Sequence, residues 1–289
     1  MNFHKPPAMY VGKVQINVSN IERSTDFYEK VLGFKIFERT ARKVVFTANG
    51  VEPLLIINQP ENVIPKTMHT TGLYHFALLL PKRSDLANVV RHFVRNGIRF
   101  ASGDHLVSEA IYLNDPDGNG IEIYCDRDPE TWNWQDEEVE MTTDPVDFEN
   151  LLMEKSENSW QGMPTQTVMG HLHLQVGDLD ENEKFYIDGL GFRIVNHFGN
   201  SALFISDHNY HHHIAFNIWN GRSLPNAAKN MVGLVSYSIV LKDEMMREKL
   251  IERLRKNNVT VHEESGTYFV VDPSNVRVEL VVFSCSSRA

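Results

Sequence analysis

Residues 103–122 bring together side chains that serve in proton transfer and metal binding. The stretch contains His105, Tyr112 and Glu122, with the turn sequence DPDGNG between the last two. Proline and glycine favour chain reversal and short apolar runs flank the turn, so two antiparallel strands are predicted here. Glu122 stands between two isoleucines. A carboxylate among apolar neighbours needs a cation or hydrogen bonds, so Glu122 either faces water, as most strand glutamates do, or faces a metal ion.

The chain repeats itself, which indicates how such residues could be positioned. The strings FYEKVLGF at 27–34 and FYIDGLGF at 185–192 each follow an alternating strand and end a predicted helix. A second type of unit lies after each of them, with closing strings DPDGNGIEI and DPSNVRVEL. Each unit reads as strand, helix and about three strands. A unit of this size cannot bury both faces of its sheet, so the four units are expected to pair.

These units define the predicted domain organisation. Residues 9–127 hold two units, residues 168–285 hold two more, and residues 128–167 form a connector. The connector contains Trp132 and Trp134, an acidic run and a short helix predicted near Phe148 to Met153. It is long for a plain linker, which suggests a role in the topology.

Aligning the units gives two columns of equivalent positions. The opening strands supply Lys13, His75, His171 and Ser236, and the closing strands supply Leu54, Glu122, His213 and Glu279. Two neutral imidazoles and one carboxylate on a rigid sheet form a facial triad with open positions, the ligand set typical of non-haem Fe(II). A single strand histidine is more often part of a core. The coincidence of His and Glu at matching positions of some units, and not others, favours a metal site.

Two pairings of units would complete such a triad. Units 3 and 4 would combine His171, His213 and Glu279, whereas units 2 and 3 would combine His75, Glu122 and His171 across the connector. Units 1 and 2 would lack one histidine.

Composition limits the other classes of function. The net charge of −10 argues against a nucleic-acid partner, and no apolar run is long enough for a membrane span. The two cysteines, Cys125 and Cys285, form no CxxC pair, so neither a disulfide framework nor a thiolate zinc site is expected. A cytoplasmic protein without a membrane association is expected, and assembly into a homo-oligomer is compatible with the sequence.

The repeats resemble the vicinal oxygen chelate superfamily over nearly the whole chain outside the connector. The residues Gly103-Asp104-His105, Ile111-Tyr112, Asp115-Pro116, Gly118 and Glu122 are similar to the signature of type I extradiol ring-cleavage dioxygenases, the catechol 2,3-dioxygenase class. The resemblance implies an α+β fold of four βαβββ units, the glyoxalase/bleomycin-resistance/dioxygenase fold, paired into cupped mixed sheets. It also implies cleavage of a catechol-type aromatic ring with O2.

The resemblance also assigns roles to residues. It implies Fe(II), with Mn(II) as the alternative, bound by His75 and Glu122 and by a histidine of the partner unit. It implies that His105 transfers protons and that Tyr112 orients the substrate. The first unit offers Lys13 where a histidine is expected, so His171 is the favoured third ligand, and His213 with Glu279 form the rival set. A glyoxalase-like metal-dependent lyase or isomerase and a metal-free aromatic-binding protein are the alternative functions.

Overall fold

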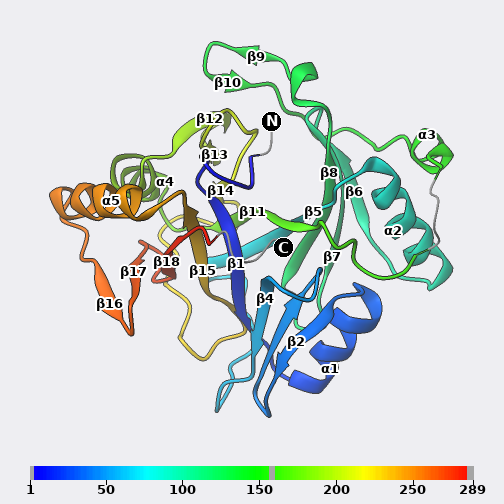
Figure 1. The fold of residues 1–289 in the computed structure, drawn as a ribbon, viewed down its shortest axis with the longest axis horizontal. Coiled ribbons are helices and arrows are strands. Elements are labelled where there is room, and N and C mark those ends of the chain that lie inside the picture. Colours follow the sequence, from blue (N-terminus) through cyan, green and yellow to red (C-terminus); the bar gives the residue numbers. More distant parts are fainter. Residues whose placement is uncertain (1–2, 156–159, 285–289) are drawn as a thin grey trace.

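The chain folds into two eight-stranded mixed sheets, and the computed structural model describes residues 3–155 and 160–284. Long strands cross at the centre of the molecule and the helices lie at its periphery (Figure 1). Both sheets are built from strand-helix-strand repeats, which confirms the predicted α+β fold of four βαβββ units. Cys285, which ends the predicted C-terminal domain, lies outside the described residues.

The first sheet combines the first and fourth units. The first unit consists of β1 (Tyr10–Asn17), α1 (Ile21–Asp26), the π-helical turn Phe27–Val31, β2 (Lys35–Arg39), β3 (Lys43–Thr47) and β4 (Pro53–Asn58). The fourth unit consists of β15 (Gly233–Leu241), α5 (Glu244–Lys256), β16 (His262–Glu264), β17 (Thr267–Val271) and β18 (Arg277–Val282). The strand order is β16-β17-β18-β15-β1-β4-β3-β2, with β1 antiparallel to β15.

The second sheet combines the second and third units. The second unit consists of β5 (Gly72–Leu79), α2 (Arg83–Arg95), β6 (Ala101–Asp104), β7 (Ser108–Asn114) and β8 (Gly120–Asp126). The third consists of β11 (Val168–Gln175), α4 (Leu179–Glu183), the π-helical turn Lys184–Leu190, β12 (Arg193–Phe198), β13 (Ala202–Ser206) and β14 (Ile214–Asn217). The strand order is β12-β13-β14-β11-β5-β8-β7-β6, with β11 antiparallel to β5. Units 2 and 3 therefore meet, which was one of the two pairings the sequence left open.

The repeated FYxxxLGF string has a local structural explanation. Asn20 and Asp178 cap the helices α1 and α4 by accepting hydrogen bonds from main-chain N–H groups one turn ahead. Both helices continue as π-helical turns, and a glycine in the left-handed region follows within two residues of each turn, Gly33 with φ 72° and Gly191 with φ 90°. The glycine of the string is therefore required by the backbone conformation at the end of the helix.

The middle of the connector lies beside the second sheet. It contains the 3-10 turn Pro129–Thr131, the hairpin strands β9 (Trp134–Gln135) and β10 (Glu138–Val139), and α3 (Phe148–Met153), the helix predicted from the sequence. Trp132 is buried against Phe3 and Tyr210. Asp144 pairs with Asp104 of the edge strand β6 through two main-chain hydrogen bonds of 2.8 and 2.9 Å. The connector is thereby fixed beside the edge of the second sheet.

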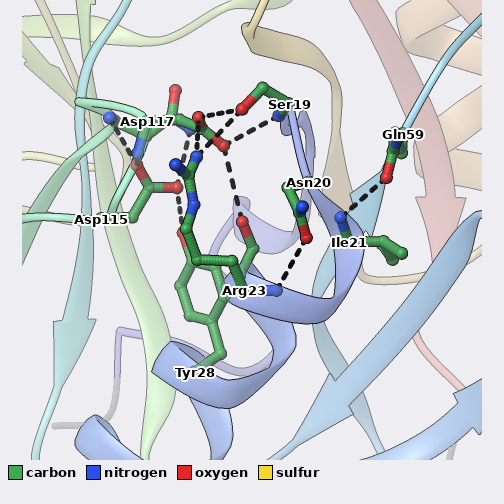
Figure 2. Close-up of polar contacts among 10 residues, drawn as sticks. Ser19, Asn20, Ile21, Arg23, Tyr28, Gln59, Asp115 and Asp117 are labelled. Atoms are coloured by element: carbon green, nitrogen blue, oxygen red, sulfur yellow. Dashed lines mark hydrogen bonds and ion pairs between the residues drawn. The ribbon is translucent and has the colours of Figure 1, made fainter.

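A polar contact joins the first unit to the DPDGNG turn of the second (Figure 2). The Tyr28 hydroxyl donates to Asp115 Oδ2 at 2.9 Å. Asp117 accepts hydrogen bonds from the Ser19 main-chain N–H at 2.8 Å and the Ser19 hydroxyl at 2.5 Å, and it also pairs with Arg23. Because the two units belong to different sheets, this contact holds the sheets together.

An equivalent contact joins the third unit to the fourth. The Tyr186 hydroxyl donates to Asp272 Oδ2 at 2.9 Å and also contacts the Tyr237 hydroxyl. The other oxygen of Asp272 accepts from the Val276 main-chain N–H at 2.8 Å. Burial raises the pKa of Asp272 to about 6, although its hydrogen bonds act in the opposite direction.

Replacement of Asp272 by asparagine should change how stability depends on pH. The Asp272 carboxyl has a pKa of about 6 in the folded chain against an ordinary value of 3.8, so the folded state binds the proton more tightly. As pH rises from about 4 to about 6, this group lowers the free energy of unfolding of the wild type by up to ~3 kcal/mol. Asparagine carries no charge and avoids that loss. We therefore expect urea unfolding at pH 4.5 and pH 7 to show Asp272→Asn gaining stability relative to the wild type at the higher pH.

The control for this experiment is Asp188→Asn, because Asp188 is exposed on the third unit. Its unfolding free energy should follow the wild type at both pH values. If the unfolding free energies of the wild type and Asp272→Asn changed equally between the two pH values, the raised pKa of Asp272 would be contradicted.

Candidate metal centre

Three buried side chains from adjacent strands of the second sheet converge. His75 lies on β5, Glu122 on β8 and His171 on β11. The Nε2 atoms of both histidines lie 3.0 Å from the same carboxylate oxygen, Oε2 of Glu122. One ligand atom from each of the three residues falls within 4.8 Å of the others. The structure therefore brings together the favoured triad from the sequence, across the pairing of units 2 and 3.

Gly120 determines how closely β8 approaches β5 beside the triad. It pairs with His75, and Glu122 pairs with the strand residue two positions further on. A Cβ atom at position 120 would lie 2.1 Å from the main-chain oxygen of Tyr74 and 3.0 Å from His75 Cβ. Only glycine fits at that distance. The last glycine of the DPDGNG turn therefore allows β8 to lie close enough to β5 for the Glu122 carboxylate to contact the histidines.

The charge balance of the triad calls for a cation. Burial lowers the pKa of His171 to about 4, so its imidazole is neutral near pH 7. Burial by itself raises the pKa of Glu122, but the contacts with His171 and His75 outweigh burial and hold it well below the usual range. An ionised carboxylate thus stands beside the neutral imidazole of His171, buried from solvent. Without a counter-ion this arrangement is costly.

The geometry of the triad also fits a metal ion. His75 Nε2 is buried and makes no hydrogen bond, although it lies 3.0 Å from Glu122 Oε2. Ligand atoms bound at right angles at ~2.1 Å from one ion are about 3 Å apart, which agrees with the two histidine-carboxylate distances. The three side chains come from one sheet face, so the remaining coordination positions would be directed away from the sheet. The donor set and the unpaired nitrogen both fit a divalent metal.

A pocket of about 840 Å³ opens over the triad, and it contains a second functional pair. The Nδ1 of His105 lies 2.7 Å from the Thr142 carbonyl oxygen of the connector, and its Nε2 lies 2.6 Å from the Tyr112 hydroxyl. A carbonyl only accepts, so Nδ1 carries the proton and Nε2 of the neutral ring accepts from Tyr112. Gly103 makes room, because a Cβ there would approach the His105 ring at 3.0 Å.

The rival ligand His213 is engaged elsewhere. Its Nε2 donates to the Phe3 carbonyl at 3.0 Å, and its Nδ1 accepts from the Asp207 main-chain N–H at 3.2 Å. The strand register explains why the sequence alignment misled. Glu122 pairs with the residue two positions after His75, and the residue that pairs at that position in the third unit is Ala215. The alignment of His213 with Glu122 is wrong by two residues.

Glu279, the other member of the rival set, lies on β18 of the first sheet. There its carboxylate pairs with Lys13, at 3.1 Å from Oε2 to Nζ. The register of the first sheet gives Ser236 and Glu279 the positions of His75 and Glu122, and it places Ile56 where Leu54 was aligned. The structure therefore does not bring Glu279 together with His171 or His213.

Sequence reasoning did not identify several residues that line the pocket. Its wall includes Tyr74, Phe198 and Trp219. The carbonyl oxygen of Thr142, in the connector, accepts the hydrogen bond from His105 Nδ1. His212, which belongs to neither column of aligned positions, has its ring centroid 4.1 Å from that of His171. The aromatic residues belong to no repeated position. The length of the connector was the available signal for the contribution of Thr142.

The comparisons with known proteins define the family. Residues 10–123 and 168–280 match the model of the Glyoxalase/Bleomycin resistance protein/Dioxygenase superfamily, and the chain belongs to that superfamily. Within it the chain is a catechol-2,3-dioxygenase-like enzyme, as the sequence predicted. It is 42% identical over 267 residues to the Catechol-2,3-dioxygenase of Bacillus subtilis (strain 168), a match that covers 91% of this chain and 94% of that protein.

Solved structures support the fold assignment. A putative dioxygenase from Bacillus subtilis subsp. subtilis str. 168 has a TM-score of 0.63 at 14% identity, covering 95% of this chain and 85% of its own. Glyoxalase I from Zea mays has a TM-score of 0.52 at 15% identity, covering 95% and 92%. At these identities the likeness establishes the fold alone. Separately, none of the helices in the described residues is long and apolar enough to cross a membrane.

Replacement of Glu122 by glutamine should abolish tight metal binding. The amide keeps the size of the side chain but removes the charge that balances a divalent ion. We expect one Fe(II) or Mn(II) per wild-type chain and a loss of affinity of ~100-fold or more in Glu122→Gln, since even residues outside the ligand set cost 10–100-fold. Anaerobic equilibrium dialysis followed by elemental analysis measures this.

Glu279→Gln is the matched control, because Glu279 occupies the equivalent position of the first sheet. It should retain one ion per chain. Loss of metal in Glu279→Gln together with retention in Glu122→Gln would reject the site.

Proposed function

We propose that the enzyme is a non-haem Fe(II)-dependent extradiol dioxygenase that cleaves a catechol-type ring with O2. The observation that carries this proposal is the arrangement of one pocket, in which His75, Glu122 and His171 stand beside the His105–Tyr112 pair. Two histidines and one carboxylate with open positions suit Fe(II) oxygen chemistry, with Mn(II) as the alternative. The name of the Bacillus subtilis relative supports the same reaction class.

The metal site and its substrate have complementary chemistry. A bound Fe(II) would supply adjacent coordination positions for the two oxygens of a catecholate and for dioxygen. The protein supplies a largely apolar pocket in which such a diol is oriented. Residues 141–143 of the connector line this pocket as well.

His105 is suited to move a proton at Nε2. Its Nδ1–H is held by the Thr142 carbonyl at 2.7 Å, so the neutral ring keeps Nε2 as an acceptor that faces the pocket. An imidazole in such a position is the side chain most often used to accept and return protons in catalysis. It is therefore the general base for a catechol hydroxyl in this proposal.

Tyr112 acts as a hydrogen-bond donor in the same proposal. Burial, together with the neighbouring Glu122, holds the pKa of Tyr112 well above its ordinary value, so its hydroxyl remains protonated. That hydroxyl donates to His105 Nε2 at 2.6 Å. A substrate oxygen that enters the pocket can accept the same hydroxyl and be fixed in orientation.

The test is oxygen uptake by anaerobically metal-loaded protein when a catechol is added. We expect one O2 consumed per catechol and a yellow ring-opened product. His105→Ala should lower kcat by ~10²–10⁴-fold, because a general base is lost, while the bound metal content stays unchanged. His208→Ala is the control, since His208 is a surface histidine paired with Asp207.

The outcomes separate the alternative functions. Loaded protein that consumes no oxygen with any catechol tested would reject the dioxygenase. Product formation from another substrate without oxygen uptake would identify a glyoxalase-like lyase or isomerase. Binding of aromatic compounds without any metal dependence or turnover would identify a binding protein.

A further inference from the structure

The pocket is much larger than a single catechol ring requires. Its volume of about 840 Å³ lies near the upper end of the range for small-molecule sites. The triad stands on central strands of the second sheet, and the lining extends from there towards both edges. One side, near β6, contains His105 and Tyr112. The other, near β12 and the end of β14, is filled by neither the triad nor the proton-transfer pair.

That second side carries a continuous set of aromatic rings. We call Tyr74, His173, Phe198 and Trp219 the aromatic wall, and all four line the pocket. The ring of His173 lies 5.0 Å from that of His75, and the Tyr74 ring lies 4.9 Å from His173 and 5.1 Å from Trp219. The Phe198 ring follows at 6.3 Å from Trp219. The wall therefore begins at a proposed metal ligand and extends outwards from it.

The outer part of the aromatic wall is exposed to water. Relative exposure is 42% for Tyr74, 59% for Phe198 and 44% for Trp219. Three neighbouring aromatic side chains on a pocket wall leave apolar surface that a ligand can remove from solvent. Such surface is costly to leave uncovered, so it favours a ligand with an apolar face.

Trp219 is held in place before any ligand arrives. Its indole N–H donates to the Ser201 hydroxyl at 3.2 Å, and its main-chain N–H donates to Asn217 Oδ1 at 3.2 Å. A side chain fixed in this way loses little conformational entropy when a ligand packs on it. The aromatic wall is thus a preformed surface.

Charge on the pocket wall distinguishes between kinds of substituent. Among the described residues that line the pocket, Arg99 is the only arginine or lysine. It precedes β6, which forms one edge of the sheet, whereas Trp219 follows β14 in the other half of the sheet. The aromatic wall offers no cationic partner for a carboxylate. Its flat, apolar faces fit another aromatic ring.

We infer that the substrate is an aryl-substituted catechol whose second ring packs against Tyr74, Phe198 and Trp219. The inference rests on the proposed function for the diol part of the substrate. The affinity of the aromatic wall for an aryl group is independent of the metal and of turnover. Tyr74, Phe198 and Trp219 are the residues that determine specificity for the substituent.

The test measures binding to metal-free protein by calorimetry under anaerobic conditions. The probes are catechol, 3-phenylcatechol, 4-phenylcatechol and 3,4-dihydroxybenzoate. We expect at least one phenylcatechol to bind the wild type ~10-fold or more tightly than catechol, since ring stacking adds to the burial of apolar area. Trp219→Ala should reduce that preference by about 10-fold, and Phe198→Ala should reduce it as well.

Phe37→Ala is the control, because Phe37 is 50% exposed on β2 of the first sheet. It should leave the preference unchanged, and thermal unfolding of each variant verifies the fold. Equal binding of all catechols, tightest binding of the carboxylated probe, or an unchanged preference in both pocket variants would overturn the inference. Failure of oxygen uptake by loaded protein would reject the proposed reaction without affecting the binding result.

Discussion

The antiparallel pairing of β5 with β11 is the contact on which the candidate site depends. It sets His75 opposite His173 and His171 opposite Ala77, while the parallel neighbour β8 brings Glu122 beside Ala77. In a sheet, side chains two positions apart share a face, so this register directs all three ligand groups to one side. A shift by one residue would turn a histidine into the core. The metal chemistry proposed for the enzyme therefore depends on strand register.

The two tyrosine-aspartate contacts hold this arrangement against the other sheet. Tyr28 binds Asp115, and Tyr186 binds Asp272, each at 2.9 Å and each between units of different sheets. The strings FYxxxLGF and DP mark the repeats in the sequence. The tyrosine of the first string and the aspartate of the second thus form the same contact twice. The Asp115 turn also ends at Gly120, whose missing side chain allows β8 to approach β5. The structural contact and the candidate site share one turn.

The first sheet shows what the same architecture does with different residues. Its register sets Lys13 and Glu279 in the positions of His171 and Glu122, and their charged atoms lie 3.1 Å apart. There the lysine ammonium provides the positive charge that a metal ion would provide in the second sheet. Two sheets of one fold thus differ in the source of the cation that balances a strand glutamate, which is why Glu279 serves as the matched control for Glu122.

The sequence by itself determined the repeats, the α+β class and the residue types of the triad, because strand alternation, turn glycines and the recurrence of His and Glu are local patterns. It also indicated His105 and Tyr112 through the signature around the turn. Only the tertiary structure decided that unit 2 pairs with unit 3, because pairing depends on long-range strand contacts that no local pattern encodes. The two-residue error at His213 has the same origin, since register between parallel strands is set by packing. The aromatic wall belonged to no repeat, and Tyr74, Phe198 and Trp219 meet only when β5, β12 and the segment after β14 fold against one another.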